Sequence, residues 1–321
     1  MHVLVDYLTF TDKGHSRDFW VERLGLTGIR FTLAKPRYMW TEHLYYEGVH
    51  IYTSDTGDCG VELSGTGCRL IETLNQNFDW FALASELQDD ASAHISRLDI
   101  ACDDRDGILD FKKLYRHVKG RKYISRARRV IWTDGDEQQV VFGSPQSDTR
   151  LRIYNKAMER GLEDEHWIRA EFQLRNDQAE SFVMNWMKQG SLAKTFAGVL
   201  LYYLRFTTSA PDKNRNNSRI DTVSWWDAFL GECEQLPGIF TGGLEYNQER
   251  LDKALKMCLS TVATFVRSQG GDLTRLVELI SYAEINPRQQ EFLDNLERDH
   301  DNNNSLSGKP ARKGGGGQYA L

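Results

Sequence analysis

The fold of this chain is decided by the stretch Ile95-Ser-Arg-Leu-Asp-Ile-Ala-Cys-Asp103, which alternates polar and apolar side chains. Successive side chains of a β-strand point to opposite faces of its sheet. The stretch therefore presents Arg97 and Asp99 on one face, and Leu98 and Ile100 on the other. Residues 150–156 and 167–175 alternate in the same way. We expect three strands of an antiparallel sheet with one face on an apolar core, and the pattern predicts an α+β fold.

The polar face of these predicted strands would collect the groups that phosphoryl transfer on DNA requires. Adjacent strands lie roughly 4.8 Å apart, so Asp99, Glu171 and Tyr154 could converge around one metal ion if their strands are neighbours. Carboxylate oxygens suit Mg²⁺ or Mn²⁺, and such an ion would hold a phosphate and spread the charge that develops on it. A free tyrosine has a pKa of about 10, and Lys156 and Arg152 on the same strand face would favour its phenolate. The combination predicts a metal-assisted tyrosine nucleophile.

Composition bounds the class of protein. The 321 residues are 40% hydrophobic, which is ample for a buried core. No run approaches the roughly 18 apolar residues that span a bilayer, and the first residues lack a basic region followed by an apolar stretch. We therefore expect a soluble, cytoplasmic protein without membrane partners. The five cysteines show no Cys-x-x-Cys spacing, which argues against a disulfide framework and a thiolate zinc site.

The charge of the chain is unevenly distributed. The net charge is −6, but residues 112–129 contain no acidic residue. This basic stretch holds Lys112, Lys113, Arg116, Lys119, Arg121, Lys122, Arg126, Arg128 and Arg129, with Tyr115 and Tyr123 between them. Such a density of cations sets a local field regardless of distant acids, so we expect the stretch to contact DNA.

Hydrophobic periodicity and turn residues predict the other elements. We expect strands near residues 3–10, 27–31, 37–46, 49–54, 59–64, 122–126, 128–133 and 138–143, and helices near 14–24, 108–118, 177–188 and 225–230. Asp106 is the expected N-cap of the helix at 108–118. Residues 1–90 and 91–240 share an order of elements, with Asp6 at the place of Asp99, which suggests an internal duplication.

The composition changes in the last third of the chain. We expect a catalytic domain over residues 1–240, a helical accessory segment over 245–300 and a disordered tail over 301–321. Helices are expected at 247–268, 272–283 and 287–299, with Asp272 and Asn286 as caps. These helices could read DNA, although their apolar spacing fits packing or dimerisation better. The polar loop at 213–219 is another candidate for DNA contact.

Three motifs give the chain a resemblance to a known family. Ser96-Arg-Leu-Asp-Ile-Ala-Cys-Asp103, Gly143-Ser-Pro-Gln-Ser-Asp-Thr-Arg-Leu-Arg-Ile-Tyr-Asn-Lys156 and Arg169-Ala-Glu-Phe-Gln-Leu-Arg175 resemble the replication initiation factor (Rep_trans) family. That family includes rolling-circle plasmid initiators, related relaxases and filamentous-phage replication proteins. The stretch 61–69 and the pair Trp225-Trp226 resemble the phage-type members in particular.

The resemblance implies a site-specific DNA strand transferase that initiates rolling-circle replication of a phage or plasmid. It would nick one strand at an origin and stay joined through a 5′-phosphotyrosine, with Tyr154 as the nucleophile. Asp99 and Glu171 are then metal ligands, and Asp103 is a third candidate. Arg97, Arg169 and Arg175 are candidates for phosphate contact. The implied partners are double- and single-stranded origin DNA, a host helicase with the replication machinery, and in one alternative a second copy of the chain.

Two departures from related enzymes leave alternatives open. No His-x-His pair occurs, so the two-histidine metal site of the broader rolling-circle and relaxase enzymes is absent, although His94 and His166 flank two of the motif strands. No second tyrosine lies one helical turn from Tyr154, so a terminating attack would need Tyr123, Tyr115, a second subunit or water. A conjugative relaxase with the same chemistry is one rival function, and a non-catalytic origin-binding regulator is another. An RNA-binding module is disfavoured because no aromatic RNP-type strand is present.

Overall fold

The computed structural model describes residues 2–37, 39–135, 137–162, 164–212, 217–231 and 262–282. By its contacts the chain divides into two compact units, residues 1–241 and 242–321. The predicted catalytic domain, accessory segment and tail remain predictions.

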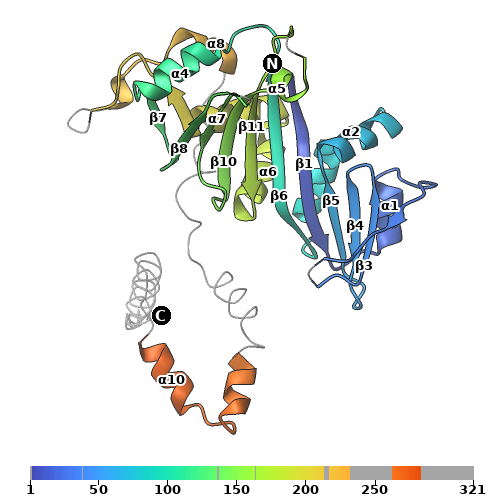
Figure 1. Cartoon of the computed structure of the whole chain (residues 1–321). Coiled ribbons are helices and arrows are strands. Elements are labelled where there is room, and N and C mark those ends of the chain that lie inside the picture. The colour runs from blue at the N-terminus through green and yellow to red at the C-terminus, as the bar shows by residue number, and fades with distance from the viewer. Residues whose placement is uncertain are drawn as a thin grey trace, which may run out of the picture. The chain divides into compact units, whose positions relative to one another are not determined.

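A large antiparallel sheet dominates the first unit (Figure 1). Among the described residues ten strands pair in the order β2-β3-β4-β5-β1-β6-β11-β10-β9-β8, and every pair is antiparallel. The strands are β1 (His2–Asp12), β2 (Thr32–Leu33), β3 (Glu42–Tyr46), β4 (Val49–Thr53), β5 (Cys59–Leu63), β6 (Ala93–Asp104), β8 (Val130–Thr133), β9 (Gln139–Phe142), β10 (Thr149–Asn155) and β11 (Ile168–Arg175). Strands β7 (Tyr123–Ser125) and β12 (Leu204–Phe206) form a separate pair. The predicted α+β fold on an antiparallel sheet is confirmed.

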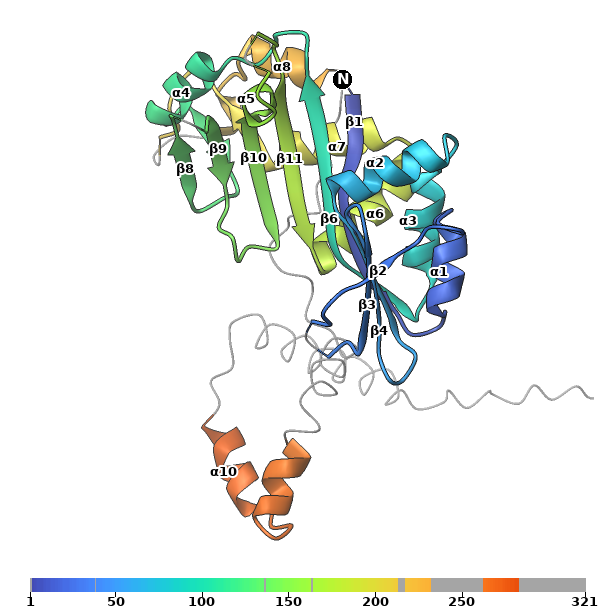
Figure 2. The same ribbon diagram turned by 45° about the vertical axis from the view of Figure 1, so that its right-hand side comes forward.

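The helices of this unit are α1 (Arg17–Arg23), α2 (Gly65–Leu74), α3 (Trp80–Asp89), α4 (Phe111–Lys119), α5 (Lys156–Glu159), α6 (Asp177–Gln189), α7 (Leu192–Tyr203) and α8 (Ser224–Leu230). Helices α6 and α7 pack on the apolar face of the sheet. Figures 1 and 2 show α6 and α7 behind the central strands. Phe182 of α6 and Phe196 of α7 belong to one buried cluster with Ile100, Ile153 and Phe172 of the sheet. The apolar half of the alternation therefore forms the core, and the other half is left for the polar face.

A close backbone contact fixes α2 against the hairpin of β4. A Cβ atom on Gly67 would lie only 2.4 Å from the backbone oxygen of Gly48, so no larger residue fits there. Ser64 caps the helix by accepting a hydrogen bond from the Gly67 amide at 3.4 Å. The cap and the glycine together explain why a helix begins in a stretch for which the sequence predicted none.

Several predicted elements need correction. Residues 27–31 are not a strand, because Gly28 turns the chain with a φ of +87°. The strand expected at 37–46 is shortened to β3. Helix α4 is capped by Asp110, which accepts from the Lys113 amide at 2.8 Å, rather than by Asp106. The helices α2, α3 and α7 were not predicted from the sequence.

The order of strands is symmetric about the central pair β1–β6. Strand β5 returns beside β1, and β11 returns beside β6, so that the two sets extend the sheet in opposite directions. Two similar halves would produce this order. The duplication itself stays a prediction.

The second unit is described only between residues 262 and 282. Residues 262–268 are helical, and α10 spans Thr274–Ser281. Asp272 accepts a hydrogen bond from the Thr274 amide at 2.9 Å, but the N-cap residue of α10 is Leu273 and not the predicted Asp272. The expected helix at 287–299 and the tail at 301–321 lie outside the described residues, as do positions 213–216 of the polar loop. None of the helices in the described ranges has the length and apolar character needed to cross a lipid bilayer.

Candidate active site

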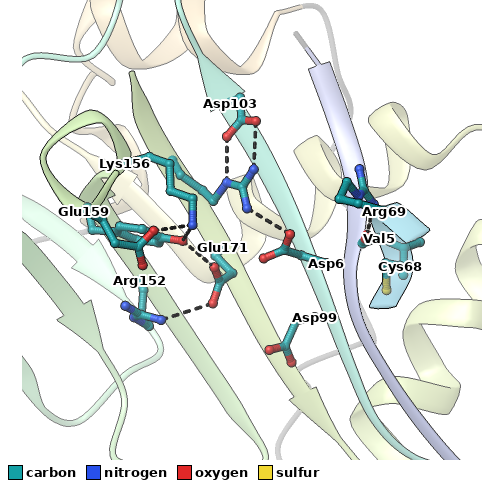
Figure 3. Close-up of polar contacts among 12 residues, drawn as sticks. Val5, Asp6, Cys68, Arg69, Asp99, Asp103, Arg152, Lys156, Glu159 and Glu171 are labelled. Atoms are coloured by element: carbon teal, nitrogen blue, oxygen red, sulfur yellow. Dashed lines mark hydrogen bonds and ion pairs between the residues drawn. The ribbon is translucent and has the colours of Figure 1, made fainter. Parts of the chain in front are cut away.

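The three predicted strands are neighbours, and their polar side chains form one surface. The order β6-β11-β10 places Gln173 opposite Asp99 and Arg152 opposite Glu171. Although this face is polar, its centre is withdrawn from solvent, and Glu171 and Asp99 are buried. Figure 3 shows Asp99, Glu171 and Asp6 on this side of the sheet. Charged groups held in such a place interact more strongly than they would in water.

Tyr154 points to this polar face and not into the apolar core. Its hydroxyl donates a hydrogen bond to Glu171 Oε2 at 2.8 Å, and Lys156 Nζ lies 3.4 Å from the same hydroxyl. Arg152 Nη1 lies 3.3 Å from the other oxygen of Glu171, and Lys156 also pairs with Glu159. The structure thus brings a phenol, a carboxylate and two cations together, all from β10, β11 and the start of α5.

The phenol is protonated in the free protein. Burial raises the pKa of Tyr154 well above its ordinary value, and the negative charge of Glu171 raises it further. Arg169 acts in the opposite direction, but does not outweigh these effects. Tyr154 therefore needs a proton acceptor in order to attack, and Glu171 already accepts its hydrogen bond.

Arg169 holds two carboxylates in place. Its Nε and Nη2 donate to the two oxygens of Asp103 at 2.7 and 2.9 Å, and its Nη1 lies 2.9 Å from Asp6 Oδ1. Burial would raise the pKa of Asp103, but the hydrogen bonds and charge of Arg169 lower it below its usual value. Both oxygens of Asp103 are thus committed to a guanidinium. Asp103 stays a predicted metal ligand, and it would have to give up part of this pairing to bind an ion.

Asp99 is a buried acid on the same face, and its burial disfavours the ionised form of its carboxyl. Burial raises its pKa to about 7; Arg97, which it contacts at 2.9 and 2.6 Å, offsets this only in part, and Glu171 and Asp6 add to the rise. The negative charges of Glu171 and the half-buried Asp6 thus oppose the ionisation of the buried Asp99. A divalent cation with oxygen ligands would favour the ionised carboxylates, so these residues fit such an ion in chemistry.

The carboxylates of this face are not gathered as closely as the ligands of one ion would be. In the part of the chain that the structure describes, the one group of acidic, histidine or cysteine ligand atoms that all lie within 4.8 Å of one another is Asp12, His15 and Asp90. Asp12 is fully buried and accepts hydrogen bonds from Gly14, Ser92, Trp20 and His15. Its lone pairs are already used to tie the end of β1 to α1, so this group is better explained as a structural anchor than as a metal site.

The flanking histidines and the alternative tyrosines lie elsewhere. His94 pairs with Glu180 of α6 at 2.7 Å, and His166 lies 3.2 Å from Asp104. Tyr123 packs against Phe142 on the apolar side of the sheet, and Tyr115 packs against Trp132. The structure brings none of these four side chains to the hydroxyl of Tyr154.

The basic stretch 112–129 forms α4, β7 and the turn that leads into β8 at the edge of the sheet. Arg121, Lys122, Arg126, Arg128 and Arg129 are exposed. Across the described ranges, no side chain of this stretch forms an ion pair with a carboxylate. Arg126 lies over the ring of Tyr202 at 3.9 Å, and Lys119 over that of Tyr115 at 5.5 Å. The cations are therefore available to an external anion.

Comparison with known proteins agrees with this geometry. Residues 93–243 match the Rep_trans family, replication initiation factor. The resemblance predicted from the motifs is thereby confirmed for that segment, which contains Asp99, Tyr154 and Glu171. The fold is similar to that of a solved rolling circle replication initiator protein from Geobacillus stearothermophilus, with a TM-score of 0.62 and 27% sequence identity over 71% of this chain and 94% of that one. No curated protein sequence matches the chain.

Sequence reasoning missed three groups of this face. Asp6 was noted only as a counterpart of Asp99, because a β-bulge between Val5 and Tyr7 breaks the alternation that would have indicated its direction. Tyr7 donates to Glu62 at 2.7 Å and stacks under Arg97. Arg150 lies in the alternating stretch 150–156 but was given no role. The alternation of polar and apolar residues along β10 already indicated that Arg150 points to the polar face.

Proposed function

We propose that the chain is an origin-specific, metal-dependent DNA nicking and strand-transfer enzyme that initiates rolling-circle replication of a phage or plasmid. The proposal is carried by one observation: within the segment that matches the replication initiation factor family, the Tyr154 hydroxyl contacts Glu171 at 2.8 Å beside Lys156. A phenol on a polar, cation-flanked surface is suited to attack a phosphodiester.

In the proposed reaction Tyr154 loses its proton to Glu171, the acceptor of its hydrogen bond. The phenolate oxygen attacks the scissile phosphorus, the bond from phosphorus to the 3′ oxygen breaks, and that oxygen takes up a proton from solvent to become a 3′ hydroxyl. The product is a 5′-phosphotyrosine, which conserves a phosphoester bond. Attack by a 3′ hydroxyl on this link would re-close a strand without an external energy source. Lys156 and Arg152 would balance the charge on the phosphate during both steps.

Asp99 and Glu171 are the proposed ligands of Mg²⁺ or Mn²⁺, with Asp103 as a third and Asp6 as a neighbour. The ion, when bound, would neutralise the scissile phosphate and hold it in place. Arg97, Arg169 and Arg175 are proposed to support phosphate binding on this face. Lys119, Arg121, Lys122, Arg126, Arg128 and Arg129 are proposed to grip duplex origin DNA through its backbone.

The test is a covalent adduct. Supercoiled origin DNA is incubated with the protein and Mg²⁺ or Mn²⁺, and an adduct that survives SDS is measured for wild type, Tyr154→Phe and the control Tyr45→Phe, whose side chain is exposed on β3. We expect an adduct with wild type and Tyr45→Phe, and a loss of at least about a thousandfold with Tyr154→Phe. Unchanged nicking by Tyr154→Phe would refute the assigned nucleophile. Specific origin binding without any adduct would favour the non-catalytic regulator.

A further inference from the structure

The polar face continues beyond the candidate active site, towards the start of β10 and the end of β11. Arg150 lies two residues before Arg152 on β10, so both side chains point to this face. Arg150 is paired with Gln173, and the next residue of β11 on the same face is Arg175, which is paired with Arg97. We call Arg97, Arg150, Arg152 and Arg175 the arginine cluster.

The members of the arginine cluster are unequally neutralised. Arg97 is held by Asp99 and Arg152 by Glu171. Within the described ranges, by contrast, Arg150 and Arg175 form neither an ion pair nor a side-chain hydrogen bond. The Nε atom of Arg150 is shielded from solvent and has no hydrogen-bond partner. A buried donor of this kind costs stability unless something else binds it.

The charges of the cluster also act on one another. Burial lowers the pKa of Arg150 from its ordinary value, and the positive charges of Arg152, Arg175 and Arg97 lower it further. Glu171 acts in the opposite direction. Because Arg150 and Arg175 have no carboxylate partner in the described ranges, the site favours the binding of an external anion. The guanidinium fork of arginine matches the oxygens of a phosphate and can donate two parallel hydrogen bonds to it.

The position of the cluster indicates which phosphate it would bind. Alternate residues of a strand lie roughly 6.6 Å apart, so Arg150 lies roughly 13 Å along β10 from Tyr154. Arg152 lies between them on the same face and is nearer to a phosphate attacked by Tyr154, so Arg150 is placed to bind the next phosphate along this surface. We propose that Arg150 and Arg175 form a second phosphate subsite, which binds a non-scissile backbone phosphate of the DNA strand and so sets how the strand lies across Tyr154. This inference rests on the proposed function.

The first arm of the test measures the salt dependence of binding, in a Tyr154→Phe background so that no cleavage intervenes. Binding of oligothymidylate is followed as a function of salt for the parent, Arg150→Gln, Arg175→Gln and Arg150→Lys. Loss of one phosphate contact to a single strand lowers the slope of log K against log salt by about 0.7. We expect that change for either glutamine variant, and a smaller one for Arg150→Lys, which keeps the charge. The matched control is Arg17→Gln, whose guanidinium pairs with Glu42 on the opposite half of the sheet.

The second arm locates the phosphate. Oligonucleotides that carry the nick site are prepared with a single neutral methylphosphonate at each linkage in turn. In the parent we expect about a tenfold loss of affinity at one linkage other than the scissile one, and in Arg150→Gln the same substitution should cost nothing further. The inference is overturned if no linkage depends on Arg150, or if Arg150→Gln changes the salt slope no more than Arg17→Gln does. If the proposed function is wrong, preparations that still bind DNA will form no Tyr154 adduct. The salt slopes would still report on the subsite in that case.

The variants should also remain folded. Because Arg150 lies among like charges, Arg150→Gln is expected to unfold at the same temperature as the parent or a higher one. A lower unfolding temperature with an unchanged salt slope would mean that Arg150 only packs the sheet, and it would overturn the subsite.

Discussion

At the residue scale, Asp99 makes the stability of the metal-free protein depend on pH. Its carboxyl has a pKa of about 7 in the folded chain, against 3.8 for an ordinary aspartate. Between these values the folded state holds a proton that the unfolded state has lost, so the free energy of unfolding falls as the pH rises from about 4 to about 7. The difference corresponds to at most about 4 kcal/mol. In Asp99→Asn, which keeps an acceptor for Arg97, this fall should disappear.

Denaturant unfolding in EDTA at pH 5 and at pH 7.5 measures this effect. Asp103→Asn is the contrasting variant, because Arg169 lowers the pKa of Asp103 and its ionised form therefore stabilises the fold. At pH 7.5 we expect Asp99→Asn to be more stable than wild type and Asp103→Asn to be less stable. An equal pH dependence in Asp99→Asn and wild type would contradict the rise in the pKa of Asp99 that its burial causes.

The sequence was informative about single residues wherever strict alternation decides the direction of a side chain. It placed Asp99, Tyr154 and Glu171 on one face because β10 and β11 pair without a shift and the irregularity of β6 lies before Arg97. It could not reveal that Asp103 is held by Arg169, since that pairing depends on β11 lying next to β6. Asp6 was missed for a different reason, because a bulge shifts the register of β1. Residue identity and periodicity predict orientation, but partners depend on the order of strands.

At the scale of elements, the structure shows which of two acidic residues caps the start of α4. The sequence could not distinguish between them. Asp110 accepts from the Lys113 amide at 2.8 Å, whereas Asp106 is exposed and lies before the helix. Asp110→Ala should lower the free energy of unfolding by about 1 kcal/mol through loss of the cap. Asp106→Ala should change it by less than about 0.5 kcal/mol. Denaturant unfolding of the two variants compares them directly, and equal losses would show that the cap is not where the structure has it.

Helices and strands differed in how well the sequence predicted them. Strands β6, β10 and β11 were predicted within a residue or two of their ends. Their apolar residues on one face and their polar residues on the other both indicate a strand. Helix α2 was missed because its first turn holds two glycines, which ordinarily disfavour a helix; only the close approach of Gly67 to the backbone of Gly48 makes glycine necessary there. Helix α7 was missed because six consecutive residues, 195–200, are buried, so its middle lacks an amphipathic period.

At the scale of the whole first unit, the sheet separates the proposed chemistry from the proposed grip on duplex DNA. The candidate active site occupies the central strands β6, β11 and β10, and the basic stretch 112–129 adjoins the edge strand β8. Only β9 lies between β10 and β8, which amounts to about 10 Å across the sheet. The net charge of −6 gave no hint of this arrangement, because it sums over acids that lie elsewhere.

This separation predicts that duplex affinity depends on where positive charge is placed rather than on its total. The double variant Arg128→Gln/Arg129→Gln removes two exposed cations that have no carboxylate partner in the described ranges. Each backbone contact to B-DNA contributes about 0.9 to the slope of log K against log salt, so the slope should fall by about 2. The control Arg17→Gln/Arg23→Gln changes the net charge equally, but removes arginines that are paired with Glu42 and Glu86. Salt titrations of origin duplex binding should leave the control slope near that of wild type. A similar fall in both variants would mean that the protein attracts DNA only through its overall charge, and the basic edge would then have no special part in binding.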